Sequence, residues 1–193
     1  MNQASSNDIV DASIVRGSSN SDAMTVVGRY HAECYDAQGN LKWTEDFDNL
    51  VTDQGKAHLL NNGLAGPATA VNVRMSLFTA GAPAATWTYA TPVYTECVVG
   101  TIAARGTPTF NAASGAGTVS KATTSAVAFT IGATGATITG AAINLIVGAV
   151  GNLGNTGDTA TAGGILYSAG TFASAKTVTS GDTLNVSYTS SLT

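Results

Sequence analysis

Residues 26–60 constrain the fold most, because no other part of the chain is so densely and regularly patterned. From residue 26 to residue 35, mostly small or apolar side chains alternate with mostly polar ones. This period of two is typical of a β-strand with one buried face. The sequence Asp-Ala-Gln-Gly-Asn at residues 36–40 has turn chemistry, because Asp and Asn bond their own backbone and Gly39 tolerates a positive φ. The stretch therefore predicts the first strand and the turn of a β-hairpin.

The hairpin is predicted to run directly into a helix. Residues 41–52 return the chain as a second strand and close the edge of the sheet. Thr52 or Asp53 then supplies a side-chain oxygen that caps the first turn of a helix. This helix extends through residues 58–60 and stops at Gly63.

The rest of the chain contains short apolar or alternating runs separated by small residues. Strands are predicted within residues 71–77, 97–99, 107–110, 126–131, 136–147, 165–167, 170–173, 177–178 and 184–189. Turns are predicted between 173 and 177 and at 180–182, and loops at 111–117 and 148–164. The strand at 71–77 is expected to be half-buried, and the run at 141–147 fully buried. The pattern predicts a mainly β fold, an antiparallel β-sandwich of jelly-roll or immunoglobulin-like type with one short helix after the first hairpin. A barrel is the alternative.

The first 23 residues differ in composition from the remainder. Ser, Asn and Asp dominate, and residues 17–21 have the composition of a flexible linker. We therefore predict a flexible N-terminal arm at 1–23 and a β-sandwich domain at 24–193. The arm is either a disordered terminus or a tail that orders on a partner, with two apolar pairs as anchors. These candidate partner-binding residues are Ile9, Val10, Ile14 and Val15.

The charge is low and uneven. Charged residues make up 10% of the 193 residues, against roughly 25% in an ordinary soluble domain. Of the net charge of −4, residues 1–60 contribute −5, from nine acids and four bases, and the remainder contributes +1. This balance argues against nucleic-acid binding, which needs a basic face. No apolar run approaches the ~20 residues of a membrane helix, so we expect no membrane partner.

The titratable residues do not form a recognisable catalytic or metal-binding motif. His31, on the outward face of a strand, and His58, in the helix, are predicted to be surface imidazoles. Glu45 and Asp46 point to opposite faces of one strand, so they are not a ready acid–base pair. The sequence contains no Gly-x-Ser-x-Gly and no Cys-x-x-Cys. We therefore expect no enzymatic activity and no cofactor or metal.

Cysteines and aromatic residues are assigned to the core. The start of the chain lacks the pattern of a signal peptide, so Cys34 and Cys97 are predicted to be two buried thiols rather than a disulfide. Trp87, Tyr89 and Tyr94 cluster in one segment and are expected to cover the core, with ligand stacking as the alternative.

Several motifs occur in a fixed order. They are Tyr-His-Ala-Glu-Cys at 30–34, Gly-Asn-Leu-Lys-Trp at 39–43, Asn-Leu-Val-Thr at 49–52, Gly-Lys-x-x-Leu-Leu at 55–60, Gly-Ile-Leu-Tyr-Ser-Ala-Gly-Thr-Phe at 164–172 and Ser-Gly-Asp-Thr-Leu-Asn-Val-Ser-Tyr at 180–188. As an ordered set, they resemble a family of small virion structural proteins of tailed bacteriophages. The resemblance extends over residues 30–193 and is weakest around Trp87.

The resemblance implies a non-enzymatic component of the phage particle, made in the host cytoplasm. A low-charge β domain with an extended arm favours a capsid decoration or cement protein on the head surface, whose arm binds the major capsid protein. Such proteins form symmetric homo-oligomers, and we expect a trimer. The alternative is a tail- or fibre-associated protein that binds a host-surface glycan. That alternative predicts that Trp87, Tyr89 and Tyr94 are exposed on one face.

Overall fold

The predicted hairpin is present and is held by its turn. Strand β1 (Val26–Tyr35) pairs antiparallel with β2 (Leu41–Val51). At the turn, the Asp36 carboxylate accepts hydrogen bonds from the backbone N–H groups of Gln38 at 2.9 Å and of Asn40 at 2.8 Å. Gly39 has a φ of +84°, in the left-handed region that favours glycine. The local chemistry read from the sequence therefore forms the turn.

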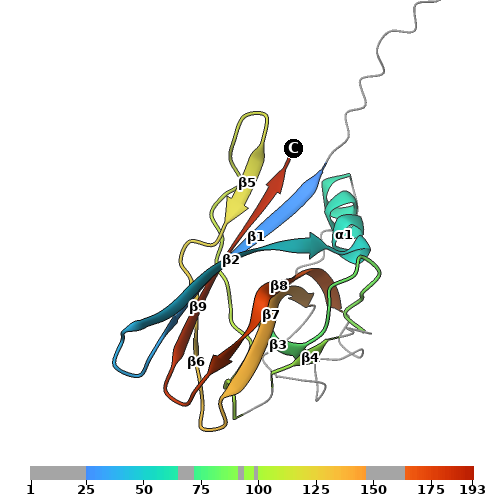
Figure 1. Cartoon of the computed structure of the whole chain (residues 1–193). Helices are drawn as coiled ribbons and strands as arrows, with labels where there is room; N and C mark the ends of the chain where they lie inside the picture. The colour runs from blue at the N-terminus through green and yellow to red at the C-terminus, as the bar shows by residue number, and fades with distance from the viewer. Residues whose placement is uncertain (1–24, 65–71, 91–93, 98–99, 147–163) are drawn as a thin grey trace, which may run out of the picture.

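The computed structural model describes residues 25–64, 72–90, 94–97, 100–146 and 164–193. These residues form nine strands and one helix, and the strands pair antiparallel. After β1 and β2 come α1 (Asp53–Gly63), β3 (Asn72–Ala80), β4 (Thr95–Glu96), β5 (Val119–Ala122), β6 (Val127–Thr130), β7 (Ala136–Ile146), β8 (Gly164–Val178) and β9 (Thr183–Leu192) (Figure 1). The prediction of a mainly β, sandwich-like fold with one short helix after the first hairpin is confirmed.

Strand β2 allows a single sheet to enclose a core. The strand order is β4-β3-β7-β8-β2-β1-β9-β5, and β6 also pairs with β9. Most of β2 pairs with β1, but its last residues, 49–51, pair with residues 168–170 of β8. Because β2 changes partner along its length, the β1–β9 half of the sheet turns over the β3–β7–β8 half (Figure 1).

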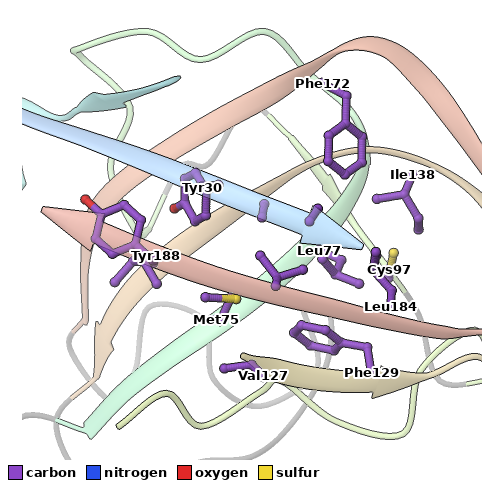
Figure 2. Close-up of a cluster of buried hydrophobic side chains, with 14 of the residues drawn as sticks. Tyr30, Met75, Leu77, Cys97, Val127, Phe129, Ile138, Phe172, Leu184 and Tyr188 are labelled. Atoms are coloured by element: carbon purple, nitrogen blue, oxygen red, sulfur yellow. The ribbon is translucent and has the colours of Figure 1, made fainter. Parts of the chain in front are cut away.

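Side chains from both halves of the sheet fill the core. The Tyr30 ring stacks on Phe47 with ring centroids 4.9 Å apart and lies 4.7 Å from the Tyr188 ring. Met75 and Leu77 approach from β3 (Figure 2). Burial of these side chains from water is the main stabilising contribution.

Both thiols belong to this core. Cys34 and Cys97 are buried and free. The prediction of two buried thiols is therefore confirmed.

Irregular chain covers the outer edge of β3. The backbone N–H of Cys97 donates to the carbonyl of Leu77 at 2.9 Å, and Met75 and Gly106 exchange two backbone hydrogen bonds of 2.8 Å. The same segment reaches the end of β6, where the N–H of Gly132 donates to the carbonyl of Thr101 at 2.8 Å. Edge strands present unpaired backbone groups that invite aggregation, and this segment removes that risk for β3.

The helix packs tightly against β8. Thr52 is the N-cap, and its side chain accepts a hydrogen bond from the N–H of Gly55 at 3.1 Å. A Cβ at Gly55 would clash with the carbonyl oxygen of Tyr167. The helix ends at Gly63, as predicted, with Leu64 as its C-cap. The helix is 11 residues long, and in the described part of the chain no helix is long and apolar enough to cross a membrane.

The structure corrects several predicted strands. Strand β3 is not half-buried: Met75 and Leu77 face the main core, while Phe78 on the other face packs in a second cluster with Trp87 and Tyr89. The predicted turn between residues 173 and 177 is wrong, since β8 is one strand of 15 residues whose end pairs with the start of β7. Residue 164 of the predicted loop at 148–164 is the first residue of β8, and the other residues of that prediction lie outside the described residues.

Two further predictions fail where local alternation is weak. Residues 107–110 form no strand, and Phe110 makes only an isolated bridge to Thr123. Strand β5, which lacked an alternating apolar pattern, pairs with the end of β9. Cys97, the first residue of the predicted strand at 97–99, lies just after β4 and outside any strand. Residues 98 and 99 of that predicted strand lie outside the described residues.

Candidate binding surfaces

The outer face of β1 and β2 carries a charged ladder, formed by Arg29, His31, Glu33, Asp46 and Asp48. Arg29 lies opposite Asp48 and His31 opposite Asp46 in the strand register. The His31 Nδ1 atom is 3.1 Å from an Asp46 oxygen, and its Nε2 atom is 3.4 Å from a Glu33 oxygen. Arg29 Nη1 lies 3.4 Å from Asp48 Oδ1. Opposite charges thus alternate across two strands.

Contacts within the ladder shift the pKa values of its residues. Partial burial opposes protonation of His31, but hydrogen bonds to Asp46 and Glu33 outweigh it and raise the pKa of His31. The Tyr35 hydroxyl donates to Glu33 at 2.9 Å, and this bond, together with His31, lowers the pKa of Glu33. The charged forms therefore stabilise each other.

A serine completes a row of Ser, His and Asp across three strands. Ser187 of β9 lies opposite His31, which lies opposite Asp46. In a catalytic triad, the second ring nitrogen of the histidine faces the serine. Here His31 Nε2 faces Glu33 at 3.4 Å instead. This geometry does not activate Ser187 as a nucleophile.

A hollow of about 620 Å³ lies over part of this face. It opens where β2 leaves β1 after Asp48, so that Asn49 pairs with β8 while Gly28 continues beside β9. Asn49 donates to the Tyr188 hydroxyl at 2.8 Å, and its buried Oδ1 has no hydrogen-bond partner among the described residues. A side chain at Gly28 would clash with Tyr188 and Asn49.

A second, apolar groove of about 200 Å³ lies between α1 and the two halves of the sheet. It is lined mainly by hydrophobic side chains from α1, β3, β7, β8, β9 and the segment that carries Phe110. The principal ones are Leu59, Val73, Phe110, Ile143, Leu145 and Tyr167. Lys121 and Ser190 also line it, and Ser190 Oγ lies 2.9 Å from the Tyr167 hydroxyl. At the end of α1, Leu60 and Leu64 are 49% and 77% exposed.

The predicted site residues have different outcomes. The anchors Ile9, Val10, Ile14 and Val15 lie outside the described residues. His31 is on the outward face, as predicted. His58 is half-buried and lines the apolar groove rather than being fully at the surface, and burial lowers its pKa.

The alternative prediction, that Trp87, Tyr89 and Tyr94 are exposed on one face, is wrong. Trp87 and Tyr89 are buried, with 6% and 4% exposure, and Tyr94 stacks on Phe78 at 5.1 Å. They cover the core, as the first expectation stated. Because Trp87 and Tyr89 are buried and Tyr94 is half-buried, the three residues do not form an exposed surface for a glycan.

Glu45 and Asp46 are on opposite faces of β2, as predicted. Glu45 pairs with Lys176 at 2.8 Å and accepts from the N–H of Ala173 at 2.5 Å, whereas Asp46 faces His31. In the part of the chain that the structure describes, no group of three or more His, Cys, Asp or Glu side chains is arranged to hold a metal ion.

The motifs of the ordered set meet in one packed unit. Those within residues 30–60 form parts of β1, β2 and α1, and those within 164–188 form parts of β8 and β9. β1 pairs with β2 and β9, the end of β2 pairs with β8, and the N–H of Thr52 donates to the carbonyl of Tyr167 at 3.0 Å. Segments far apart in the sequence are therefore neighbours in the fold.

Compared with known proteins, the chain matches no family model, no curated protein and no solved structure. The resemblance to phage virion proteins thus stays a prediction. The apolar groove was not predicted from the sequence, because its lining residues are spread over residues 58–190 and only the fold brings them together.

Proposed function

We propose that this chain is a non-enzymatic virion structural protein of a tailed bacteriophage. In this proposal it is a capsid decoration or cement protein that binds the major capsid protein and stabilises the head. The observation that carries the proposal is the contiguity of the motifs in β1, β2, α1, β8 and β9. Motifs that match a family by chance would be scattered over the fold, whereas motifs of a shared domain are expected to pack together.

The chemistry of the described surface supports a docking role. Charged groups of the ladder pair with each other, and Ser187, Thr189 and Ser191 of β9 continue the same hollow with small uncharged side chains. Such a surface binds through shape and hydrogen bonds more than through net charge. A homo-oligomer, a trimer in this proposal, would place copies of this surface symmetrically on the shell.

The arm is the proposed link to the capsid. Residues 1–23 hold Ile9, Val10, Ile14 and Val15 within a polar, linker-like sequence. A segment that orders on binding contributes apolar anchors while its linker adapts to the surface. The domain then sits outside the shell and the arm lies along the major capsid protein.

Copy number and arm deletion test the proposal. Quantitative gel densitometry of purified virions is expected to give a copy number of the same order as that of the major capsid protein. A copy number typical of a tail part would instead support the tail-associated alternative. Deletion of residues 1–23 is expected to reduce occupancy on purified capsids, because it removes the anchors. Unchanged occupancy would show that the arm does not bind the major capsid protein, and it would leave the copy-number result unaffected.

A further inference from the structure

We infer that the apolar groove is a docking site for Ile9 and Val10 of this chain's own N-terminal arm. The contact joins two parts of this sequence, within one copy or between two copies, so it does not depend on the proposed virion role. It concerns the first apolar pair in the free protein, before the arm binds a capsid through its anchors.

The size of the groove favours side chains over a small molecule. Its volume of about 200 Å³ is below the ~300–1,000 Å³ typical of small-molecule sites. Leu59, Val73, Ile143 and Leu145 present aliphatic surface in it. Two adjacent β-branched side chains match that surface in chemistry, since burial of apolar area drives such contacts.

The arm starts close to the groove. Thr25, the first described residue, exchanges backbone hydrogen bonds of 2.8 and 3.1 Å with Thr193. Ser190, which lines the groove, is three residues before Thr193 in sequence, about 10 Å along the strand. The 15 residues from Val10 to Thr25 reach up to about 50 Å when extended. The pair can therefore reach the groove of its own copy or of a neighbouring copy.

Charge selects the first apolar pair over the second. Asp8 and Asp11 flank Ile9 and Val10, while exposed Lys121 lines the groove. Ile14 and Val15 are instead followed by a base, Arg16.

The other lysines of the described part are engaged elsewhere. Lys42 pairs with Asp182, Lys56 with Asp53 and Lys176 with Glu45. Lys121 is therefore the lysine positioned to pair with an acidic residue of the arm.

Tethering makes this segment a favoured occupant. The Gly-, Ser- and Asn-rich composition of residues 17–21 predicts a flexible linker. A flexible tether converts docking into a local event with a high effective concentration. A free peptide of the same sequence lacks this advantage.

Thiol cross-linking in the full chain tests the inference. The variant Ile9→Cys with Leu59→Cys places one thiol in the arm and one in the groove, while the native thiols stay buried. Its matched control is Ile9→Cys with Gln38→Cys, which puts the second thiol at the exposed hairpin turn. Mild oxidation is expected to give an at least about tenfold higher yield of the disulfide for the groove variant, because docking raises the effective concentration of the two thiols. A link within one copy and a link between two copies both support the inference, and a yield equal to the control overturns it.

A charge exchange tests the orientation. In the groove variant, Lys121→Glu is expected to lower the yield about two- to fivefold, the range that an exposed ion pair allows. Adding Asp8→Lys and Asp11→Lys is expected to restore it. If Lys121→Glu leaves the yield unchanged, the proposed pairing with Asp8 and Asp11 is wrong. Neither experiment involves capsids, so its failure is distinct from failure of the proposed function.

Discussion

His31 shows at the residue scale how a strand register sets the charge of a side chain. The alternation of β1 predicts only that His31 faces outward. Pairing with β2 brings Asp46 to 3.1 Å from one ring nitrogen, and the neighbouring Glu33 lies 3.4 Å from the other. Two carboxylates around one imidazole favour the imidazolium form.

This raised pKa predicts a pH-dependent stability. The contribution of His31 is fully present below its ordinary pKa of 6.5, and it is lost as the pH rises through the higher pKa of the folded protein. The wild type is therefore expected to be more stable than His31→Gln at pH 5, with the difference shrinking toward pH 8. The effect stays below about 1 kcal/mol, because the side chain is exposed to solvent. Urea unfolding at several pH values measures it.

His58 provides a control of opposite sign. Burial lowers its pKa, so folding disfavours its protonated form. The stability of the wild type relative to His58→Gln is expected to rise as the pH increases through about 6.5. A His31 difference that grows with pH would contradict the role assigned to the ladder.

At the scale of elements, the contact between α1 and β8 depends on one glycine. Gly55 is the buried residue of the helix, and the carbonyl oxygen of Tyr167 occupies the place of its missing Cβ. Gln54 strengthens the contact by accepting from the N–H of Leu166 at 2.8 Å and of Tyr89 at 3.0 Å. The helix therefore joins β8 to the segment that carries Tyr89.

Two glycine substitutions in α1 are expected to act in opposite directions. Gly55→Ala should destabilise the protein by about 1–3 kcal/mol, because the added methyl group forces helix and strand apart. Gly63→Ala meets no atom within 4 Å and should be neutral or stabilising by up to about 1 kcal/mol, since Ala favours a helix more than Gly does. Urea unfolding of both variants checks this. Equal effects would show that helix propensity, not the close approach, governs the helix.

At the scale of the whole molecule, a buried ion pair holds in place the chain that covers the outer edge of β3. Arg105 binds Glu96 through two hydrogen bonds of 2.6 and 2.7 Å, and it donates to the Tyr89 hydroxyl at 3.0 Å. The side chains are only 3% and 8% exposed. The pair ties β4 to the chain that covers β3 and continues toward β6.

Removing one charge of this pair is expected to be costly. Glu96→Gln should destabilise the protein by about 3–5 kcal/mol, because it leaves the Arg105 charge buried without its counter-ion. The matched change Asp48→Asn breaks an ion pair whose carboxylate is 82% exposed, and it should change stability by no more than about 0.5 kcal/mol. Thermal and urea unfolding compare them. Similar losses in the two variants would argue against a structural role for the buried pair.

Local patterns predicted those parts of the fold that local chemistry forms. The hairpin turn at 36–40, the Thr52 cap and the turn at 180–182 depend on side chains that bond backbone a few residues away. Asp182, for example, accepts from the N–H of Thr179 at 2.7 Å. The buried run of β7 was also predicted, because its apolar composition alone indicates burial.

The candidate surfaces were only partly predictable. The outward position of His31 follows from the period of β1, but its carboxylate from β2 requires the register. The apolar groove could not be predicted, because its residues come from segments with no shared motif.

By itself, the sequence determined a mainly β chain with one capped helix, a low charge and an arm of distinct composition. The tertiary structure alone decided where β2 changes partner, how far β8 extends, how residues 94–97 and 100–106 cover β3, and which side chains meet in the groove. Turns and caps act within a few residues, so their signal is local. Strand partners and grooves depend on contacts such as that of the Thr52 side chain with the carbonyl of Leu166, 114 residues away, and these follow from burial of the core as a whole.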